Sequence, residues 1–475
     1  SYGSFETTQQ GFHGKKTIDH KGIQFMGAID ASAFHKQGDK KINAEGDQNS
    51  VDEKNLGANL GIKNGDLSLV LTLHNNQAET FYPGSLSLSE FEKDPSQDQD
   101  SNATEWESET TSKQLALKTL FSDNTKLEYH VSNTSTQAEF ITYSNATNFE
   151  TTQHSLDLRT KINDLVFQYG ASTKETIYDD GNDITRDETS FYGLMTASIS
   201  SQLSASAGYR THHFQTDFSH LPKKQSDSLN AFNLGGNYLI TPNTALYASF
   251  EQGYLLPNIN RINVYDFGTS AYVYNDQIKP QETGTFLVGF KYKNKQTKLV
   301  AEMFYTRLQN EIFYNPSTSK NTNLDKTNKK GINLSAQGSL ANLSGGINYQ
   351  FTSTEIEEGG ADGRYNGNVI PTAPEHTFKV HATYSFMSHL IPSLPRHSIR
   401  VSHKQNSSSY AASDFENKKG YMDGYQSTDV SYRLKNDKLT LQSGIRNLFE
   451  KSSGAFVYSS FSDKVVAYPT QYNRY

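Results

Sequence analysis

The stretch FKVHATYSF at residues 378–386 decides the fold class of this chain, because apolar and polar side chains alternate along it. Period-two alternation puts successive side chains on opposite faces of a β-strand, so one face meets an apolar medium and the other a polar one. The pattern recurs at 156–162 and 439–446. We expect Phe378, Val380, Tyr384 and Leu441 on the apolar face, with Lys379, His381 and Gln442 on the polar face.

The composition argues against a soluble multidomain protein. The chain has 475 residues and a net charge of −7, and only 34% of its residues are hydrophobic, although 28 are Tyr and 27 are Phe. The absence of cysteine excludes disulfides, thiolate metal sites and cysteine nucleophiles. No run of about 18 apolar residues is present, so no transmembrane helix is predicted, and the slight acidity argues against a nucleic-acid partner.

Short turns alternate with long polar stretches along the whole chain. The short turns include NGD at 64–66, TPN at 241–243 and NKQ at 294–296. Such alternation is typical of outer-membrane β-barrels, which have short turns on one side and long loops on the other. The spacing predicts an all-β, transmembrane antiparallel β-barrel of about 22 strands, nearly without helix. The long polar stretches are 35–50, 78–111, 177–188, 214–228, 254–281, 308–330, 354–374 and 403–423.

Four stretches in the C-terminal half resemble the TonB-dependent outer-membrane receptors, and FYPGSLSLSEFEKDP at 81–95 is similar to a loop of the ferric-citrate-type branch. Their order and spacing are those of the family, and they span most of 240–475. The resemblance implies a receptor in the bacterial outer membrane. The four stretches are LYASFEQGYLLPNINR (246–261), IKPQETGTFLVGFKY (278–292), AEMFYTRLQNEIFY (301–314) and GIRNLFEKS (444–452).

Nothing in the chain resembles the plug domain that the family carries in front of its barrel. SYGSF at the start is similar to the region after the plug and first strand, and YPTQYNR at 468–474 is similar to the region before the last strand. We therefore expect residues 1–475 to be barrel only, incomplete at both ends, with the first strand and most of the last one missing. An open seam would leave backbone groups facing lipid, which is costly, so the working protein needs the missing strands.

The resemblance implies that the intact protein binds a scarce nutrient and imports it with energy that the TonB complex supplies through the absent plug. A ferric siderophore-type chelate is the expected ligand, and cobalamin, another cofactor, copper, zinc or haem are alternatives. A passive outer-membrane pore is the competing function, and a barrel hydrolase is the competing enzyme. We expect no catalysis and no resident cofactor, and the further partners are outer-membrane lipid and lipopolysaccharide.

Residues 253–280 correspond to a long loop that meets ligand in the family. The stretch offers Arg261, Tyr265, Tyr272 and Tyr274. Aromatic faces and a guanidinium suit a bulky, planar, anionic ligand. The alternative is that these tyrosines belong to the interfacial girdle or to loop packing.

Three further groups of residues are weaker candidates. Arg364 and Tyr365 lie in DGRYNG at 362–367, and Tyr82 lies at the start of an acidic stretch, which suits a solvated loop or calcium. The stretch THHFQTDFSH (211–220) contains histidines that suit zinc or copper, but alternation separates the first two, and the alternative is a polar loop tip. These histidines are His212, His213 and His220.

Overall fold

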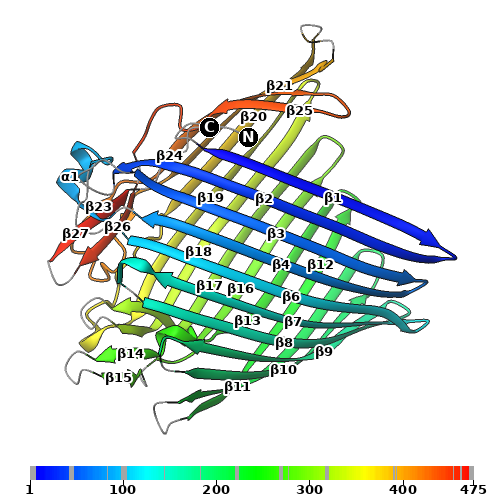
Figure 1. The fold of residues 1–475 in the computed structure, drawn as a ribbon, viewed down its shortest axis with the longest axis horizontal. Helices are drawn as coiled ribbons and strands as arrows, with labels where there is room; N and C mark the ends of the chain where they lie inside the picture. Colours follow the sequence, from blue (N-terminus) through cyan, green and yellow to red (C-terminus); the bar gives the residue numbers. More distant parts are fainter. Residues whose placement is uncertain are drawn as a thin grey trace.

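Twenty antiparallel strands form one long sheet in the computed structural model. Each strand pairs with its neighbour in the chain, from β1 to β25, and the strands slant across a strongly curved surface (Figure 1). The structure describes residues 7–41, 48–82, 84–97, 104–143, 145–181, 183–219, 224–266, 271–275, 278–315, 320–388, 391, 393–452, 454–459 and 463–469. The strands of the sheet are β1 (Thr8–His20), β2 (Ile23–Lys41), β3 (Gln48–Asn64), β4 (Leu67–Tyr82), β6 (Thr104–Ser122), β7 (Thr125–Phe140), β8 (Asn145–Ile162), β9 (Leu165–Asp179), β10 (Ile184–Ser198), β11 (Leu203–Phe218), β12 (Lys224–Thr241), β13 (Thr244–Leu255), β16 (Gln281–Lys293), β17 (Thr297–Asn315), β18 (Lys320–Leu340), β19 (Leu343–Glu358), β20 (His376–Met387), β21 (Arg396–Asn406), β24 (Gln426–Lys435) and β25 (Thr440–Ile445).

The remaining elements are short. Two small hairpins, β14–β15 and β22–β23, and a three-stranded sheet in the order β26–β27–β5 lie outside the large sheet. Among the described residues, no helix is long and apolar enough to cross a membrane. The short elements are β5 (Leu86–Ser87), α1 (Leu88–Lys93), η1 (Ile141–Tyr143), η2 (Ile259–Arg261), β14 (Asn263–Asp266), β15 (Ala271–Tyr274), η3 (Ala361–Gly363), β22 (Ser409–Tyr410), β23 (Tyr421–Met422), β26 (Gly454–Ser459) and β27 (Lys464–Pro469).

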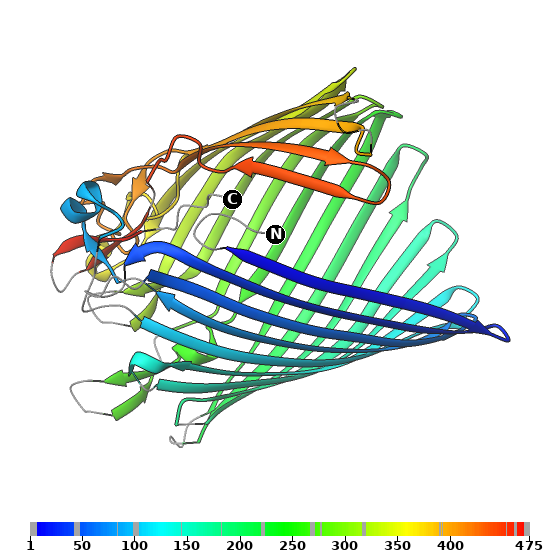
Figure 2. The same cartoon turned by 45° about the horizontal axis from the view of Figure 1, so that its top comes forward.

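The sheet curves round on itself, so that its blue first strand and its orange last strands come to face each other (Figure 2). Within the described residues, β1 and β25 are the two edges and do not pair with one another. The prediction of an antiparallel, all-β barrel with hardly any helix is confirmed, with 20 strands in the sheet where about 22 were expected. The missing-strand hypothesis remains a prediction.

The strand register separates the side chains into two faces. Residues opposite each other on neighbouring antiparallel strands share a face. Tyr384 lies opposite Leu343 and Ile399, and Ile399 lies opposite Tyr432, so an apolar row crosses four strands. The predicted apolar residues all fall on this face, and the predicted polar ones fall on the other. A bilayer requires the apolar face outside, so we call it the outer face and the opposite one the lumenal face.

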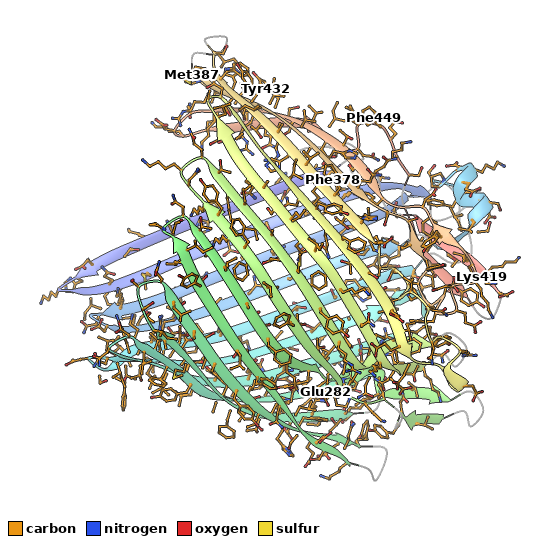
Figure 3. All side chains as sticks on the ribbon, turned by 180° about the vertical axis from the view of Figure 1, so that it is seen from behind. Glu282, Phe378, Met387, Lys419, Tyr432 and Phe449 are labelled. Atoms are coloured by element: carbon orange, nitrogen blue, oxygen red, sulfur yellow. The ribbon has the colours of Figure 1, made fainter. Side chains whose placement is uncertain are left out.

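The two ends of the sheet differ in their connections. The short turns named from the sequence all lie at one end, as predicted, and the longest connections lie at the other, which we call the loop end (Figure 1). Some connections at the loop end are short as well, such as the one between β7 and β8. Met387 marks the turn end, and Glu282 and Lys419 mark the loop end (Figure 3).

Several stretches predicted as long loops are paired strands. The stretch 308–330 is mostly β17 and β18, whose pairing continues to Asn315 opposite Lys320. Much of 35–50, 177–188 and 214–228 is likewise paired. The prediction was wrong there because polar residues continue a hydrogen-bonded ladder equally well where both faces meet water, and only the bilayer enforces apolar alternation.

Candidate functional site

The connection from β13 to β16, residues 256–280, folds onto the lumenal face near the loop end. On β10, Phe191 lies on the outer face and is 58% exposed, so alternation puts Ile184 on the lumenal face. Ile184 and Phe218 pack there with residues of the connection in one buried cluster. The pairing of β13 with β12 ends at Gln252, and this frees the chain to turn inward. The connection contributes Ile259, Ile262 and Ile278 to the cluster.

The predicted ligand residues of this connection have different surroundings. Arg261 ends η2 and is exposed. Tyr265 and Tyr272 lie opposite each other in the β14–β15 hairpin, but their side chains lie outside the described part of the structure. Tyr274 packs against Phe218, with ring centroids 4.8 Å apart. Among the described side chains of the predicted residues in this connection, Arg261 is exposed and Tyr274 is partly buried.

A buried polar cluster lies beneath the connection, and the sequence reasoning missed most of it. Arg186 is 5% exposed and His212 is 4% exposed, both on the lumenal face of β10 and β11. Glu188 receives the Lys174 ammonium at 3.0 Å and lies 3.4 Å from His212. The signal in the sequence was a pair of opposite charges, Arg186 and Glu188, spaced by two in a strand otherwise rich in Thr and Ser.

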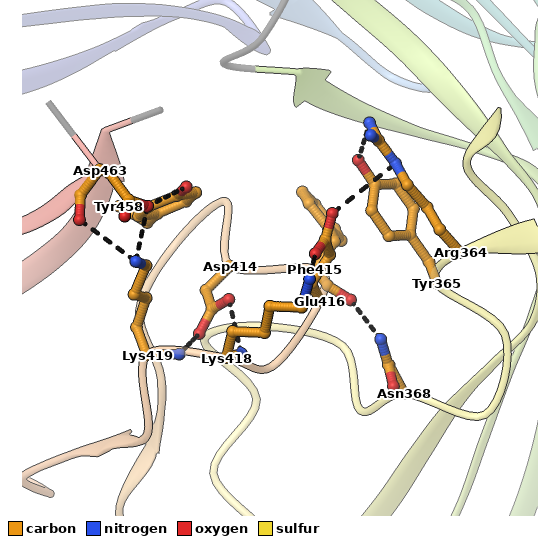
Figure 4. Close-up of polar contacts among 10 residues, drawn as sticks. All are labelled: Arg364, Tyr365, Asn368, Asp414, Phe415, Glu416, Lys418, Lys419, Tyr458 and Asp463. Atoms are coloured by element: carbon orange, nitrogen blue, oxygen red, sulfur yellow. Dashed lines mark hydrogen bonds and ion pairs between the residues drawn. The ribbon is translucent and has the colours of Figure 1, made fainter. Parts of the chain in front are cut away.

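A second cluster holds the connection between β19 and β20 against the connection between β21 and β24. Its buried members are Leu324 and Ile356 from the strands and Tyr365 and Phe415 from the two connections. The rings of Tyr365 and Phe415 lie 5.6 Å apart (Figure 4). Phe415, an isolated aromatic in a polar stretch, was not singled out from the sequence.

Arg364 and Tyr365 are brought together in this second cluster. The Arg364 guanidinium lies over the Tyr365 ring at 4.9 Å, and its Nε is 3.9 Å from Glu416 (Figure 4). Tyr365 is only 5% exposed, whereas the Arg364 side chain is 43% exposed. Gly360 makes this packing possible, because its φ is +78° and a Cβ there would come within 2.7 Å of the tyrosine ring.

The connection between β21 and β24 is closed by Asp414. Its carboxylate accepts hydrogen bonds from the backbone N–H groups of Lys418 and Lys419, at 3.1 and 2.9 Å (Figure 4). The Lys419 ammonium in turn lies 2.6 Å from Asp463, which also accepts the Tyr458 hydroxyl at 2.9 Å. Hydrogen bonds first from Lys419 and then from Tyr458 lower the pKa of the Asp463 carboxyl.

The three-stranded sheet joins distant parts of the chain at the loop end. Leu86 and Ser87 of β5 pair with Ala467 and Val466 of β27. Leu86, Phe91 and Ala467 form a small buried core. A capping box starts α1, because the Ser87 side chain accepts from the Glu90 N–H while the Glu90 side chain accepts from the Ser87 N–H.

The remaining candidates are Tyr82 and the three histidines, of which His212 belongs to the buried polar cluster. Tyr82 ends β4 and is 48% exposed. His212 and His213 face opposite sides of the sheet, as alternation predicted, and His213 pairs with the Ser228 hydroxyl at 3.1 Å. His220 lies outside the described residues.

Part of the acidic stretch predicted as a loop is strand. β6 begins at Thr104, so Glu105 and Glu107 are in the large sheet. Their carboxylates and that of Glu79 have oxygens within 4.8 Å of one another, on the outer face by register. The loop prediction was wrong for these residues because charged residues can continue a hydrogen-bonded ladder outside the bilayer, where solvent screens their repulsion.

The two inward-folded connections each place one arginine at the loop end. Arg261 is exposed in the first connection, and Arg364 in the second lies over the Tyr365 ring. Fixed guanidinium groups beside rings offer charge-assisted hydrogen bonds and stacking to an anionic, planar ligand.

Comparison with known proteins identifies the family. Residues 8–448 match the family described as "TonB dependent receptor-like, beta-barrel". The chain is 24% identical over 306 residues to the probable TonB-dependent receptor BfrD of Bordetella pertussis, a match covering 58% of this chain and 38% of that receptor. It is 23% identical over 243 residues to the catecholate siderophore receptor Fiu of Escherichia coli, covering 50% and 31%. The matches thus span less than half of these relatives.

Solved structures agree on the fold. The closed form of the Escherichia coli ferric-catecholate import receptor Fiu superposes with a TM-score of 0.79 at 14% identity, covering 99% of this chain and 79% of that one. The siderophore receptor PiuA of Acinetobacter baumannii gives 0.78 at 16%, covering 100% and 79%. The resemblance found in the sequence is therefore confirmed, and the chain belongs to the TonB-dependent receptor β-barrel family, whose members reside in the outer membrane of Gram-negative bacteria.

Proposed function

We propose that the complete protein binds an anionic ferric chelate at the loop end and imports it across the outer membrane. The observation that carries this proposal is the connection 256–280, which packs on the lumenal face and leaves Arg261 exposed. Arg364 adds a second, half-exposed guanidinium from the other inward connection. Relatives described as catecholate and ferric siderophore receptors support the same ligand class.

The net negative charge of the chain makes fixed arginines important for binding an anionic ligand. The chain is net negative, so an anionic ligand gains attraction only where cationic donors are fixed. A planar guanidinium donates hydrogen bonds in a fixed fork and is less strongly hydrated than an ammonium. Each such bond to an anion contributes on the order of 1.5–3 kcal/mol, or roughly ten- to a hundredfold in affinity.

Energy for import comes, in this proposal, from the TonB complex acting through a plug that precedes the barrel. The family membership supports this coupling, and the large polar lumen supports a plug, because an unfilled barrel of this width is a channel. The lipid partners of the proposal are the bilayer around the outer face and lipopolysaccharide above it.

The test is Arg261→Ala in the complete protein, with Arg159→Ala as its control, since Arg159 is an exposed arginine of β8 on the lumenal face away from the connection. Binding of ferric tris-catecholate, ferric citrate and the neutral ferric tris-acetohydroxamate is measured at several salt concentrations. We expect Arg261→Ala to weaken an anionic complex at least tenfold, with a smaller salt dependence, and the control to bind normally.

Two results would contradict the proposal. Equal affinity of the parent for the neutral and anionic complexes would remove the anionic ligand class. Uptake that continues in cells without a proton motive force would favour the passive pore over the TonB-driven transporter.

A further inference from the structure

The start of the connection 256–280 crosses the lumenal wall of β10 and β11. Residues 254–257, which join the end of β13 to this connection, contact the wall at two points. The Tyr254 ring stacks on the His212 ring, with centroids 5.2 Å apart and planes 29° apart. The second contact is a hydrogen bond from Arg186 to the Pro257 carbonyl.

Arg186 contacts both the wall and the backbone of this segment. Its Nη1 donates to the Pro257 carbonyl oxygen at 2.8 Å, its Nε donates to the Thr216 hydroxyl at 3.0 Å, and its guanidinium lies 5.8 Å from the Phe214 ring centre. Thr216 and Phe214 are both fully buried on β11. A guanidinium that the wall holds through Thr216 and Phe214 has little freedom, so it fixes the backbone carbonyl that it binds.

A chain of polar contacts holds the neighbouring wall. Arg210 donates to the Ser190 hydroxyl at 2.9 Å, so the Ser190 proton is free for Nδ1 of His212, 2.7 Å away. The His212 Nε2 lies 3.4 Å from a carboxylate oxygen of Glu188. Lys174 neutralises Glu188 from the other side. The ring on which Tyr254 stacks is thereby fixed in one orientation.

Burying these charged side chains costs folding free energy, which a wall with a purely structural role would not require. Arg186 is 5% exposed, and its Nη2 has no hydrogen-bond partner among the described residues. A buried cation with an incomplete set of partners lowers stability, and such groups call for a reason other than folding.

From these contacts we infer that Arg186 is a positioning residue, which anchors the connection 256–280 to the barrel wall and so holds Arg261 toward the ligand. The half of this inference that concerns ligand rests on the proposed function, and the anchoring half does not. The connection is then a preformed platform, and its affinity for ligand depends on a residue that the ligand does not touch.

A spin label reports anchoring without any ligand. Residues 1–475 contain no cysteine, so Asn258→Cys is a single labelling site among them. Asn258 is exposed, makes no capping hydrogen bond and adjoins Pro257. The label is introduced into the complete protein in lipid nanodiscs, alone and together with Arg186→Gln, Arg186→Lys or the control Arg159→Gln.

We expect an immobile label in the parent and in Arg159→Gln, a mobile one in Arg186→Gln, and partial restoration in Arg186→Lys. Binding of ferric tris-catecholate by the unlabelled variants is expected to fall ten- to a hundredfold in Arg186→Gln and less in Arg186→Lys, which keeps the charge but loses the fork. Should Arg186→Gln fail to insert, Thr216→Val removes one of the same hydrogen bonds and is expected to mobilise the label partly.

The outcomes separate the two proposals. An immobile label in every Arg186 and Thr216 variant overturns the anchoring. A mobile label with unchanged chelate affinity overturns the positioning role. If the parent binds none of the chelates, the proposed function fails, and the label alone then decides whether Arg186 anchors the connection.

Discussion

The Asp414 carboxylate stabilises the connection between β21 and β24, and its removal has a calculable effect. Asp414 is 2% exposed and accepts two backbone hydrogen bonds, from Lys418 at 3.1 Å and from Lys419 at 2.9 Å. A hydrogen bond to a charged acceptor is worth about 1.5–3 kcal/mol. Water replaces part of this in Asp414→Ala, because both lysines lie in a solvated connection, so we expect local opening to become easier by about 2–4 kcal/mol.

Hydrogen exchange at single amides measures that local opening. A change of about 2–4 kcal/mol corresponds to a roughly 30- to 700-fold faster exchange of the Lys418 and Lys419 amides. Amides in the middle of β20 are expected to exchange at the parent rate, because the large sheet does not depend on this connection. Asp414→Asn keeps one acceptor oxygen without the charge and is expected to fall between Ala and the parent.

Asp423→Asn is the matched control, since Asp423 is an exposed acid in the same connection. Its exchange pattern is expected to match that of the parent. Unchanged exchange of Lys418 and Lys419 in Asp414→Ala would refute the reasoning, because it would mean that the carboxylate does not hold these amides in solution.

Three further predictions test other parts of the structure. Met303→Arg, on the outer face, is expected to lower the free energy of unfolding in lipid vesicles by about 2–4 kcal/mol, whereas lumenal Gln337→Arg changes it little; equal losses would contradict the face assignment. Ser87→Ala removes the capping box and is expected to destabilise α1 by about 1 kcal/mol, read from faster amide exchange there. Hydrogen bonds from Lys419 and Tyr458 lower the pKa of Asp463, so the Lys419–Asp463 contact is present above the ordinary Asp pKa and is lost only as pH falls through the lowered value. NMR titration of the Asp463 carboxyl measures this pKa, and Lys419→Met is expected to return it toward the ordinary value.

The sequence predicted strands well where the outer face meets the bilayer and the lumenal face meets water. The alternation at 378–386 falls within β20, which runs from His376 to Met387. The paired part of 308–330 escaped prediction because its Thr, Asn and Lys residues carry no apolar alternation outside the bilayer. Apolar alternation in the sequence therefore indicates the membrane-embedded part of a strand. The part outside the bilayer is set by pairing with the neighbouring strand, which the sequence pattern does not show.

The sequence predicted which loops form the candidate site, but not which of their residues are exposed. Arg261 and Arg364 lie in inward-folded connections, as long polar stretches suggested. Tyr274 and Tyr365 pack within those connections, and an aromatic residue in a polar stretch looks the same whether it faces ligand or loop. Their contact with ligand remains a prediction. Arg186 was missed because its partner, the Pro257 carbonyl, is a backbone group far along the chain, and no residue pattern encodes it.

The small sheet at the loop end has a consequence for the order of assembly. Every pairing in the large sheet joins strands that follow one another, so hairpins can be added one at a time with short loop closures. Leu86 and Ala467 are different, because they meet only after almost the whole chain between them has been laid down. The entropy lost on closing a loop grows with its length, so we expect this contact to form last and to open first. Its presence therefore marks a molecule in which the curved sheet is complete from one edge to the other.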